Sequence, residues 1–386
     1  MTSEERRQGR YERRQQKRLA KKAALSFDHD DFDKVFSYGN LYKAYRKTRR
    51  GVAWKRSTQR YIAQAPLNVF RTYARLQNGT FRSDGFYEFD ISERGKTRHI
   101  RSVTINERVV QRCLCDNALV PMIDRTFIYD NGATQVNKGY HFSMDRLKCH
   151  LQRHYRKYGT EGYILLYDFS KFFDRVDHGI IQDIMERQFQ DDRIKKLCKH
   201  FIDCFGERGM GLGSQVSQTY ALASANRIDH YFKDVMRIKG YGRYMDDGYI
   251  IAKDKETLHR CLEDLRKLCD ESHISLNEKK TCIVKLSHGF TWLKCRWFLT
   301  ETGRVVKKIY KRSVTKQRQK LKKFAQLVKQ GKMSIEDVYT SFQSWKAYAR
   351  HFDAWNTIRN MEQLFRELFF CLIRPGQPGE RTGLYA

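Results

Sequence analysis

The chain has 386 residues, of which 75 are Lys or Arg and 44 are Asp or Glu, so its formal net charge is +31. No apolar run is long enough to cross a membrane as a helix, and the basic N-terminus lacks the apolar segment of a secretory signal. A positive charge of this size favours a polyanionic partner. We expect nucleic acid rather than a membrane surface, since no single amphipathic helix concentrates the basic residues.

The first part of the chain is predicted to be a basic arm followed by helices and one hairpin. Residues 1–25 carry nine Lys or Arg against three Glu, so we expect a flexible or partly helical arm. Residues 87–105 alternate between apolar and polar side chains, which predicts a β-hairpin with its turn at residues 93–95. Residues 36–55 are predicted to form a helix followed by a basic loop, and residues 57–81 to contain a second amphipathic helix that closes at Asn78-Gly79. A third helix is predicted from residue 106 to a stop near Pro121.

The central part is predicted to contain a buried strand and a second hairpin. Residues 162–170, GYILLYDFS, form a compact apolar run that leads into Asp168, as a buried strand would. Residues 243–254, RYMDDGYIIAKD, are typical of a hairpin whose D-D-G turn joins two apolar segments. Helices are expected at residues 178–204, with a break at 190–192, at 217–237 and at 255–274.

The last part is predicted to be basic and helical. Residues 304–323 contain ten Lys or Arg and no acidic residue. Two helices should follow, the first beginning at Ser334, whose hydroxyl together with Asp337 forms a Ser-x-x-Asp cap.

Three carboxylates stand where these elements end: Asp168 after the strand, and Asp246 and Asp247 in the hairpin. If the two elements are neighbours in one sheet, the carboxylates converge, and converging carboxylates repel one another unless cations lie between them. Hard oxygen ligands suit Mg²⁺, and two such ions about 3.5–4 Å apart can serve nucleotidyl transfer. A D-D-G sequence alone is equally typical of an ordinary turn.

The segments around these acids resemble motifs of reverse transcriptases. The run Tyr244-Met245-Asp246-Asp247 is similar to the Y-x-D-D box of that family, and residues 167–178, YDFSKFFDRVDH, resemble the preceding palm motif. The resemblance implies two Mg²⁺ ions, for which Mn²⁺ can substitute. It also implies the following metal ligands: the carboxylates of Asp168, Asp246 and Asp247, and the carbonyl of Phe169.

The same resemblance implies residues that bind the incoming dNTP. Phe173 matches the aromatic steric gate that excludes a ribose hydroxyl, and Tyr244 and Met245 belong to the same pocket. Residues 94–102, RGKTRHIRS, resemble the finger hairpin that grips the triphosphate, through Lys96 and Arg98, with Arg101 a weaker candidate.

Downstream motifs follow in the family order. Residues 276–281, LNEKKT, resemble the motif that carries a catalytic lysine near the departing pyrophosphate. We choose Lys280 over Lys279. Residues 290–297, FTWLKCRW, resemble the primer-grip hairpin, with Leu-Lys in place of the usual Leu-Gly.

One departure from the common pattern points to a subtype. Most reverse transcriptases of this type carry Q-G-x-x-x-S-P between the two acidic motifs, whereas residues 212–218 here are LGSQVSQ. This variant resembles the reverse transcriptases of diversity-generating retroelements, which copy a template-repeat RNA into cDNA and misincorporate opposite template adenines. The resemblance implies that Leu212, Gly213 and Gln218 belong to the dNTP pocket. We hypothesise that Leu212, which cannot hydrogen-bond there, loosens checking of the nascent pair; as the alternative, it is only a packing residue.

The expected fold is α+β, a right-hand polymerase with fingers, a palm containing an antiparallel sheet, and a helical thumb. The predicted divisions are an N-terminal arm (1–25), fingers with part of the palm (26–160), palm (161–300), and thumb with the C-terminal tail (301–386). The expected partners are template RNA, cDNA, dNTPs and an oligomeric basic accessory variability protein, in the cytoplasm of a bacterium. Two alternatives remain: a retron-like or phage-defence reverse transcriptase without the mutagenic role, and a catalytically silent nucleic-acid-binding scaffold.

Overall fold

The computed structural model describes residues 3–93, 96–211 and 213–370, and its contacts divide the chain into two compact units. The first unit contains Met1–Arg146, Tyr167–Ile250 and His259–Cys282. The second contains Leu147–Leu166, Ile251–Leu258 and Ile283–Ala386. Within the described residues, no helix combines the length and the apolar character that a membrane span requires.

The N-terminal part of the first unit is helical. Its helices are α1 (Ser3–His29), α2 (Phe32–Val35), α3 (Tyr38–Thr48), α4 (Arg56–Ala63), α5 (Ala65–Gln77), α6 (Ile105–Leu114) and α7 (Val120–Ile123). The basic arm, expected to be flexible or partly helical, is one continuous helix. The helix expected to stop near Pro121 runs on to Ile123. A π-helical turn at Cys115–Leu119 leads directly into α7, so the chain stays helical through Pro121.

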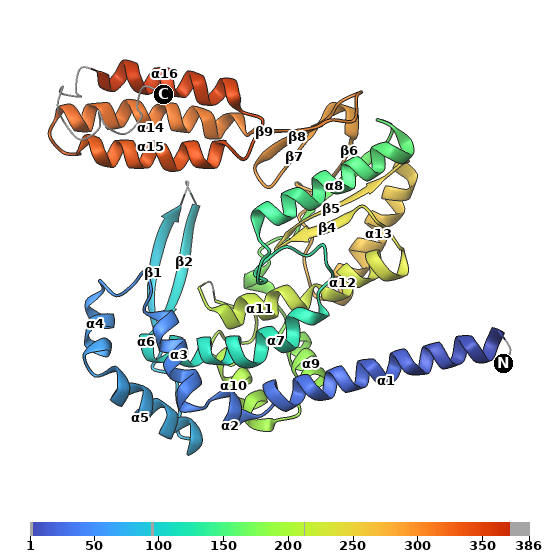
Figure 1. Cartoon of the computed structure of the whole chain (residues 1–386), viewed down its shortest axis with the longest axis vertical. Helices are drawn as coiled ribbons and strands as arrows, with labels where there is room; N and C mark the ends of the chain where they lie inside the picture. Colours follow the sequence, from blue (N-terminus) through green and yellow to red (C-terminus); the bar gives the residue numbers. More distant parts are fainter. Residues whose placement is uncertain (1–2, 94–95, 212, 371–386) are drawn as a thin grey trace. The chain divides into compact units, whose positions relative to one another are not determined.

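The predicted first hairpin is confirmed. Strand β1 (Phe86–Glu93) pairs antiparallel with β2 (Lys96–Val103) over their whole length (Figure 1). One face of β1 exposes apolar side chains, while the other carries charged contacts. There, Glu88 forms an ion pair with Arg101, whose Nε lies 3.0 Å away, and lies 3.3 Å from a ring nitrogen of His99.

A four-stranded sheet has the strand order β4-β5-β3-β6, and Figure 1 shows β4 and β5 side by side. Its strands are β3 (Tyr163–Asp168), β4 (Tyr241–Tyr244), β5 (Asp247–Ala252) and β6 (Cys282–Lys285). Strand β3 is buried from Ile164 to its end at Asp168, which confirms the strand predicted at 162–170. Because β5 and β3 are hydrogen-bonded neighbours, the two acidic motifs meet at one edge of the sheet.

Helices α8 (Tyr140–Tyr158), α9 (His178–Gln188), α10 (Asp192–Asp203), α11 (Gln215–Ser224), α12 (Asn226–His230) and α13 (Lys255–Glu271) complete the central region. The predicted break at 190–192 is confirmed, because Asp191 caps α10 and the Asp30 carboxylate accepts from the backbone N–H groups of Gln190 and Asp191. The single helix expected at 217–237 is instead divided at Ala225 and ends in a π-helical turn, Tyr231–Val235.

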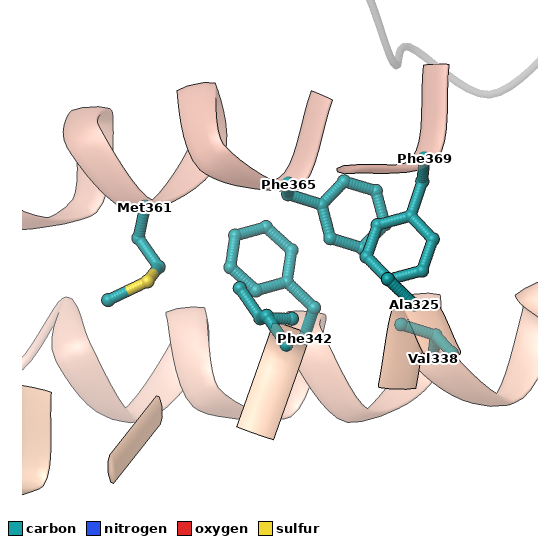
Figure 2. Packing of buried hydrophobic residues seen from close by; sticks show 7 residues of the cluster. Ala325, Val338, Phe342, Met361, Phe365 and Phe369 are labelled. Atoms are coloured by element: carbon teal, nitrogen blue, oxygen red, sulfur yellow. The ribbon is translucent and has the colours of Figure 1, made fainter. Parts of the chain in front are cut away.

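The second unit contains a three-stranded sheet and a three-helix bundle. The sheet has the order β7 (Phe290–Trp292), β8 (Cys295–Leu299), β9 (Val305–Ile309), and the bundle consists of α14 (Lys311–Lys329), α15 (Ile335–Ala349) and α16 (Trp355–Phe369). The predicted cap is confirmed, since the Ser334 hydroxyl accepts from the Asp337 N–H at 3.1 Å. Figure 2 shows the bundle core, in which the rings of Phe342 and Phe365 stack with centroids 4.7 Å apart.

Candidate active site

The turn that carries the two adjacent acids is tighter than the sequence suggested. Tyr244 pairs with Asp247, so the loop consists of Met245 and Asp246 alone, and Asp247 and Gly248 already lie in β5. A Cβ at Gly248 would lie 2.1 Å from the Tyr167 ring, so glycine is required here by close packing rather than by the turn. Met245 takes a positive φ of 55°, a strained conformation for a residue with a side chain.

A buried arginine holds this strained turn. Arg243 Nη1 donates to the Met245 carbonyl at 2.9 Å, and Nη2 donates to the Leu222 carbonyl at 3.1 Å. Its Nε and Nη2 also donate to the two carboxylate oxygens of Asp229, at 2.8 and 2.6 Å. Both side chains of this ion pair are completely buried. Burial alone would lower the pKa of the Arg243 guanidinium, but the charge and hydrogen bonds of Asp229 more than offset this and raise it.

The same carboxylate accepts from two further side chains. The Tyr241 hydroxyl donates to Asp229 at 2.6 Å, and Asn131 Nδ2 donates to it at 3.3 Å. The Tyr167 and Tyr241 hydroxyls lie 2.8 Å apart and share a hydrogen bond. Burial raises the pKa of both phenols, so each stays protonated and can donate. The network therefore links the end of β3 to β4, beneath the acidic turn.

Backbone hydrogen bonds bring Asp168 to this turn. The Phe169 N–H donates to the Asp246 carbonyl at 3.0 Å, and the Asn277 N–H donates to the Asp168 carbonyl at 2.8 Å. Three segments that are far apart in the sequence thus meet around one carboxylate. The Asp168 side chain is itself buried, with 7% of its surface exposed.

The oxygens of Asp168 have two side-chain partners. Lys280 Nζ lies 2.7 Å from Oδ1, and Asn277 Nδ2 donates to Oδ2 at 2.9 Å. Partial burial would lower the pKa of the Lys280 ammonium, but its hydrogen bond to Asp168 and the three nearby carboxylates raise it. Lys280, rather than Lys279, is the lysine with a described bond to Asp168.

The surroundings of Asp246 and Asp247 disfavour the ionised form of both carboxyl groups. Burial, followed by repulsion from Asp246 and Asp168, raises the pKa of Asp247 to about 7. Burial and the negative charge of Asp168 likewise raise the pKa of Asp246. Three carboxylates gathered in a poorly hydrated place disfavour their own ionisation, and a nearby cation relieves this cost.

The carboxylate oxygens of Asp168, Asp246 and Asp247 fit a hard divalent cation such as Mg²⁺. A cation would also offset the repulsion among the three carboxylates. Within the described residues, no three His, Cys, Asp or Glu side chains form a group able to hold one metal ion. Asp168 instead turns its oxygens to Lys280 and Asn277. Metal binding would therefore require the Asp168 side chain to exchange these partners.

The other predicted site residues are placed as follows. The half-buried Phe173 follows β3, and its carbonyl accepts from the Met210 N–H at 2.8 Å. The half-buried Tyr244 ring lies edge-on to Tyr140, and burial raises the pKa of its hydroxyl. Gln218 is half-buried in the first turn of α11.

Three predicted residues can be described only through the backbone or not at all. Lys96 and Arg98 lie in β2, opposite Glu93 and Ile91 in the register. Leu212 lies outside the described residues, while Gly213 beside it has a positive φ of 106°. The weaker candidate Arg101 is already engaged, with its Nε 3.0 Å from Glu88.

Sequence reasoning missed three residues that build the site: Asp229, Arg243 and Asn277. Arg243 directly precedes the acidic box, and its position in an otherwise apolar strand was the available signal. Asp229 carried no signal, because one acid in an amphipathic helix is indistinguishable from a solvated one. Asn277 lies in the LNEKKT segment, where the lysines drew attention away from it.

The comparison with protein families decides the assignment. The family model "Reverse transcriptase (RNA-dependent DNA polymerase)" matches residues 89–297, which is more than half of the chain. The chain belongs to the reverse transcriptase family. Its α+β fold with antiparallel sheets is that of the right-hand polymerases, as predicted. No curated protein matches this reverse transcriptase in sequence.

Solved structures of fungal telomerases are similar to this reverse transcriptase. The telomerase of Candida albicans in complex with a TWJ fragment of telomeric RNA aligns with a TM-score of 0.47 and 12% identity, covering 74% of this chain and 54% of that one. The apo telomerase of Candida tropicalis aligns with a TM-score of 0.44 and 13% identity, covering 58% of this chain and 49% of that one. The chain thus spans about half the length of these telomerase chains.

Proposed function

We propose that this reverse transcriptase copies a template-repeat RNA into cDNA, with errors directed to template adenines, and so diversifies a target gene. The observation that carries the subtype is the segment 212–218, LGSQVSQ, which resembles that of diversity-generating retroelements. The catalytic part of the proposal rests on Asp168, Asp246 and Asp247, which one sheet edge brings together.

In the proposed reaction, the 3′-hydroxyl of the growing strand attacks the α-phosphate of a dNTP, and the bond to the departing pyrophosphate breaks. When bound, two Mg²⁺ ions activate the hydroxyl and stabilise the charge on the leaving group. Asp168, Asp246 and Asp247, with the Phe169 carbonyl, would hold them. We assign Lys280 to the pyrophosphate, since its ammonium would be released from Asp168 when that carboxylate takes a metal.

The dNTP pocket is proposed to use residues on either side of these acids. Phe173 would pack against the sugar and exclude a 2′-hydroxyl, and Tyr244 and Met245 would line the pocket floor. Lys96 and Arg98 on β2 would contact the triphosphate through charge-assisted hydrogen bonds.

The residues that follow Leu212 in the proposed mutagenic segment lead into helix α11. Ser214 caps α11, its hydroxyl accepting from the Ser217 N–H at 3.3 Å and donating to Gln111 Oε1 at 3.0 Å. Gln111 in turn donates to the buried Glu107 at 3.1 Å. These bonds hold the start of α11 at Ser214, two residues after Leu212, which replaces a residue able to hydrogen-bond.

The polymerase part is tested by cDNA synthesis on a defined RNA template with Mg²⁺ and dNTPs. Asp246→Ala should reduce the rate by at least about 10²–10³-fold, because charge stabilisation in the transition state is lost. Asp183→Ala, at an exposed position of α9, is the matched control and should leave synthesis unchanged. Absence of synthesis by the unmodified protein, with template and accessory protein supplied, would favour the non-catalytic scaffold.

The mutagenic part is tested by sequencing the cDNA, with and without an accessory variability protein. Errors should concentrate at template adenines, and Leu212→Gln should lower their frequency relative to errors at the other bases. An unchanged adenine error frequency in Leu212→Gln would contradict the role of Leu212. Faithful cDNA from the unmodified protein would instead favour a retron-like or phage-defence enzyme.

A further inference from the structure

Two adjacent cavities open in the second unit, where the three-stranded sheet meets the starts of α14 and α16. The larger has a volume of about 760 Å³, and the smaller one of about 370 Å³. Arg304, Phe352 and Asp353 line both, so the two form one continuous groove. The larger volume lies within the range of roughly 300–1,000 Å³ that is usual for pockets that bind ligands.

The groove is strongly basic. Arg304, Lys308, Lys311 and Arg318 line the larger cavity, against a single carboxylate, Asp353. Among the described residues, Lys308, Lys311 and Arg318 have no carboxylate partner. The smaller cavity continues the charge with Lys148, Lys307 and Arg350. Such a concentration of uncompensated cations attracts a polyanion.

The one carboxylate is already engaged in holding the groove together. Asp353 Oδ2 accepts from the Lys307 N–H at 2.8 Å, and Oδ1 lies 3.4 Å from Arg304 Nη2. The Asp353 N–H returns a bond to the Lys307 carbonyl at 2.8 Å. These bonds hold β9 against the segment between α15 and α16. The backbone that carries Arg304 and Lys307 is therefore fixed along one side of the groove.

An exposed aromatic ring completes the larger cavity. Trp355, the first residue of α16, lines the cavity with 65% of its surface exposed. Within the described part of the chain, no other aromatic ring packs against it. Indole faces offer nucleobases a stacking platform, which stabilises binding without requiring a particular base.

We propose that this groove binds an unpaired strand of nucleic acid, its phosphates on the cations and one base on Trp355. In a duplex the base faces are stacked on each other, so the Trp355 indole would find no free base face to stack on. In an unpaired strand the base faces are free. The two cavities together accommodate more than one nucleotide, which suits a strand that passes through the groove.

The test compares two probes on the full chain by fluorescence anisotropy. One is a labelled, unstructured RNA of about twelve nucleotides, and the other is the same strand annealed to its complement. Trp355→Ala should weaken binding of the single strand roughly 5- to 150-fold and change duplex binding far less. Trp54→Ala, at an indole that is 74% exposed in the first unit, is the matched control and should change neither.

The cations are tested separately. Lys311→Ala should weaken single-strand binding and reduce the slope of log affinity against log salt by about 0.7, the value for one lost phosphate contact. Lys316→Ala, on the same helix but outside the groove lining, should alter binding less. Equal losses for single strand and duplex would overturn the proposal, and so would unchanged affinity in both groove variants. Circular dichroism of each variant verifies that these exposed substitutions leave the fold intact.

Discussion

The acidic turn and the three-helix bundle are held by opposite kinds of interaction. Beneath the turn lies a buried polar network in which Asp229 accepts from Arg243, Tyr241 and Asn131. The bundle is held by apolar packing, with Leu321, Val338 and other buried side chains around a stack of phenylalanine rings (Figure 2).

This difference concerns precision rather than strength. Hydrogen bonds and ion pairs are directional, so the network fixes where the Met245 carbonyl, and hence the turn, can lie. Apolar packing is less directional and tolerates exchange of similar side chains. The turn that carries the proposed catalytic acids therefore depends on a buried ion pair, whereas the core of the bundle is apolar.

Breaking the buried ion pair should have the largest effect. Asp229→Ala leaves the Arg243 guanidinium buried without its carboxylate, which should cost about 3–5 kcal/mol of unfolding free energy and abolish synthesis. Chemical denaturation and primer extension measure the two effects. Asp33→Ala is the control, because the bidentate pair of Asp33 with Arg193 is exposed and should contribute only about 0–1 kcal/mol.

A double variant separates positioning from stability. Asp229→Leu combined with Arg243→Met replaces the pair by apolar groups and should recover much of the lost stability. Synthesis should remain low, since the Met245 carbonyl has lost its donor. Recovery of both properties would contradict a positioning role and leave the pair a purely structural one.

The bundle should respond to the size of its side chains. Phe342→Ala opens a cavity beside Phe365 and should cost about 3–5 kcal/mol, measured by thermal unfolding. Phe342→Leu keeps most of the volume and should cost far less. A large loss with Phe342→Leu as well would mean that the bundle, like the turn, depends on a specific geometry.

A glycine tests the close packing on the sheet. Gly248→Ala places a methyl group against the Tyr167 ring and should cost about 1–3 kcal/mol. Gly39→Ala is the matched control, since nothing lies within 4 Å of its added Cβ in α3 and helix propensity should then increase stability by up to about 1 kcal/mol. Equal effects at the two sites would show that β5 can move away from Tyr167.

Elements with a strong local signal could be predicted from the sequence. The strand before Asp168, the first hairpin and the cap at Ser334 each depend on spacing or on residues a few positions apart. The three acids could be singled out because motif, charge and chemistry agreed. Their convergence then followed from placing two strands in one sheet.

What escaped prediction depends on contacts that are distant in sequence. Gly248 is required in β5 because Tyr167, on another strand, occupies the space that a side chain would take. The role of Asp229 could be recognised only in the folded structure, where its carboxylate pairs with Arg243. The division of the expected helix at Ala225 likewise could not be predicted, because no Pro or Gly lies in this segment.

The smallest expected effect concerns the pKa of His99 on the hairpin of β1 and β2, where its polar contacts face solvent. A hydrogen bond from His99 Nδ1 to Asp90 at 2.9 Å raises the pKa of His99 above its ordinary value of 6.5; desolvation opposes this rise, and a second hydrogen bond to Glu88 supports it. The contribution to hairpin stability is therefore complete below pH 6.5 and is lost as the pH rises through the raised pKa. In an NMR titration, Asp90→Asn should lower the His99 pKa more than Glu88→Gln does. The opposite order would make Glu88 the main partner, and an unchanged pKa in both variants would show that solvent has screened these contacts, unlike the buried pair beneath the turn.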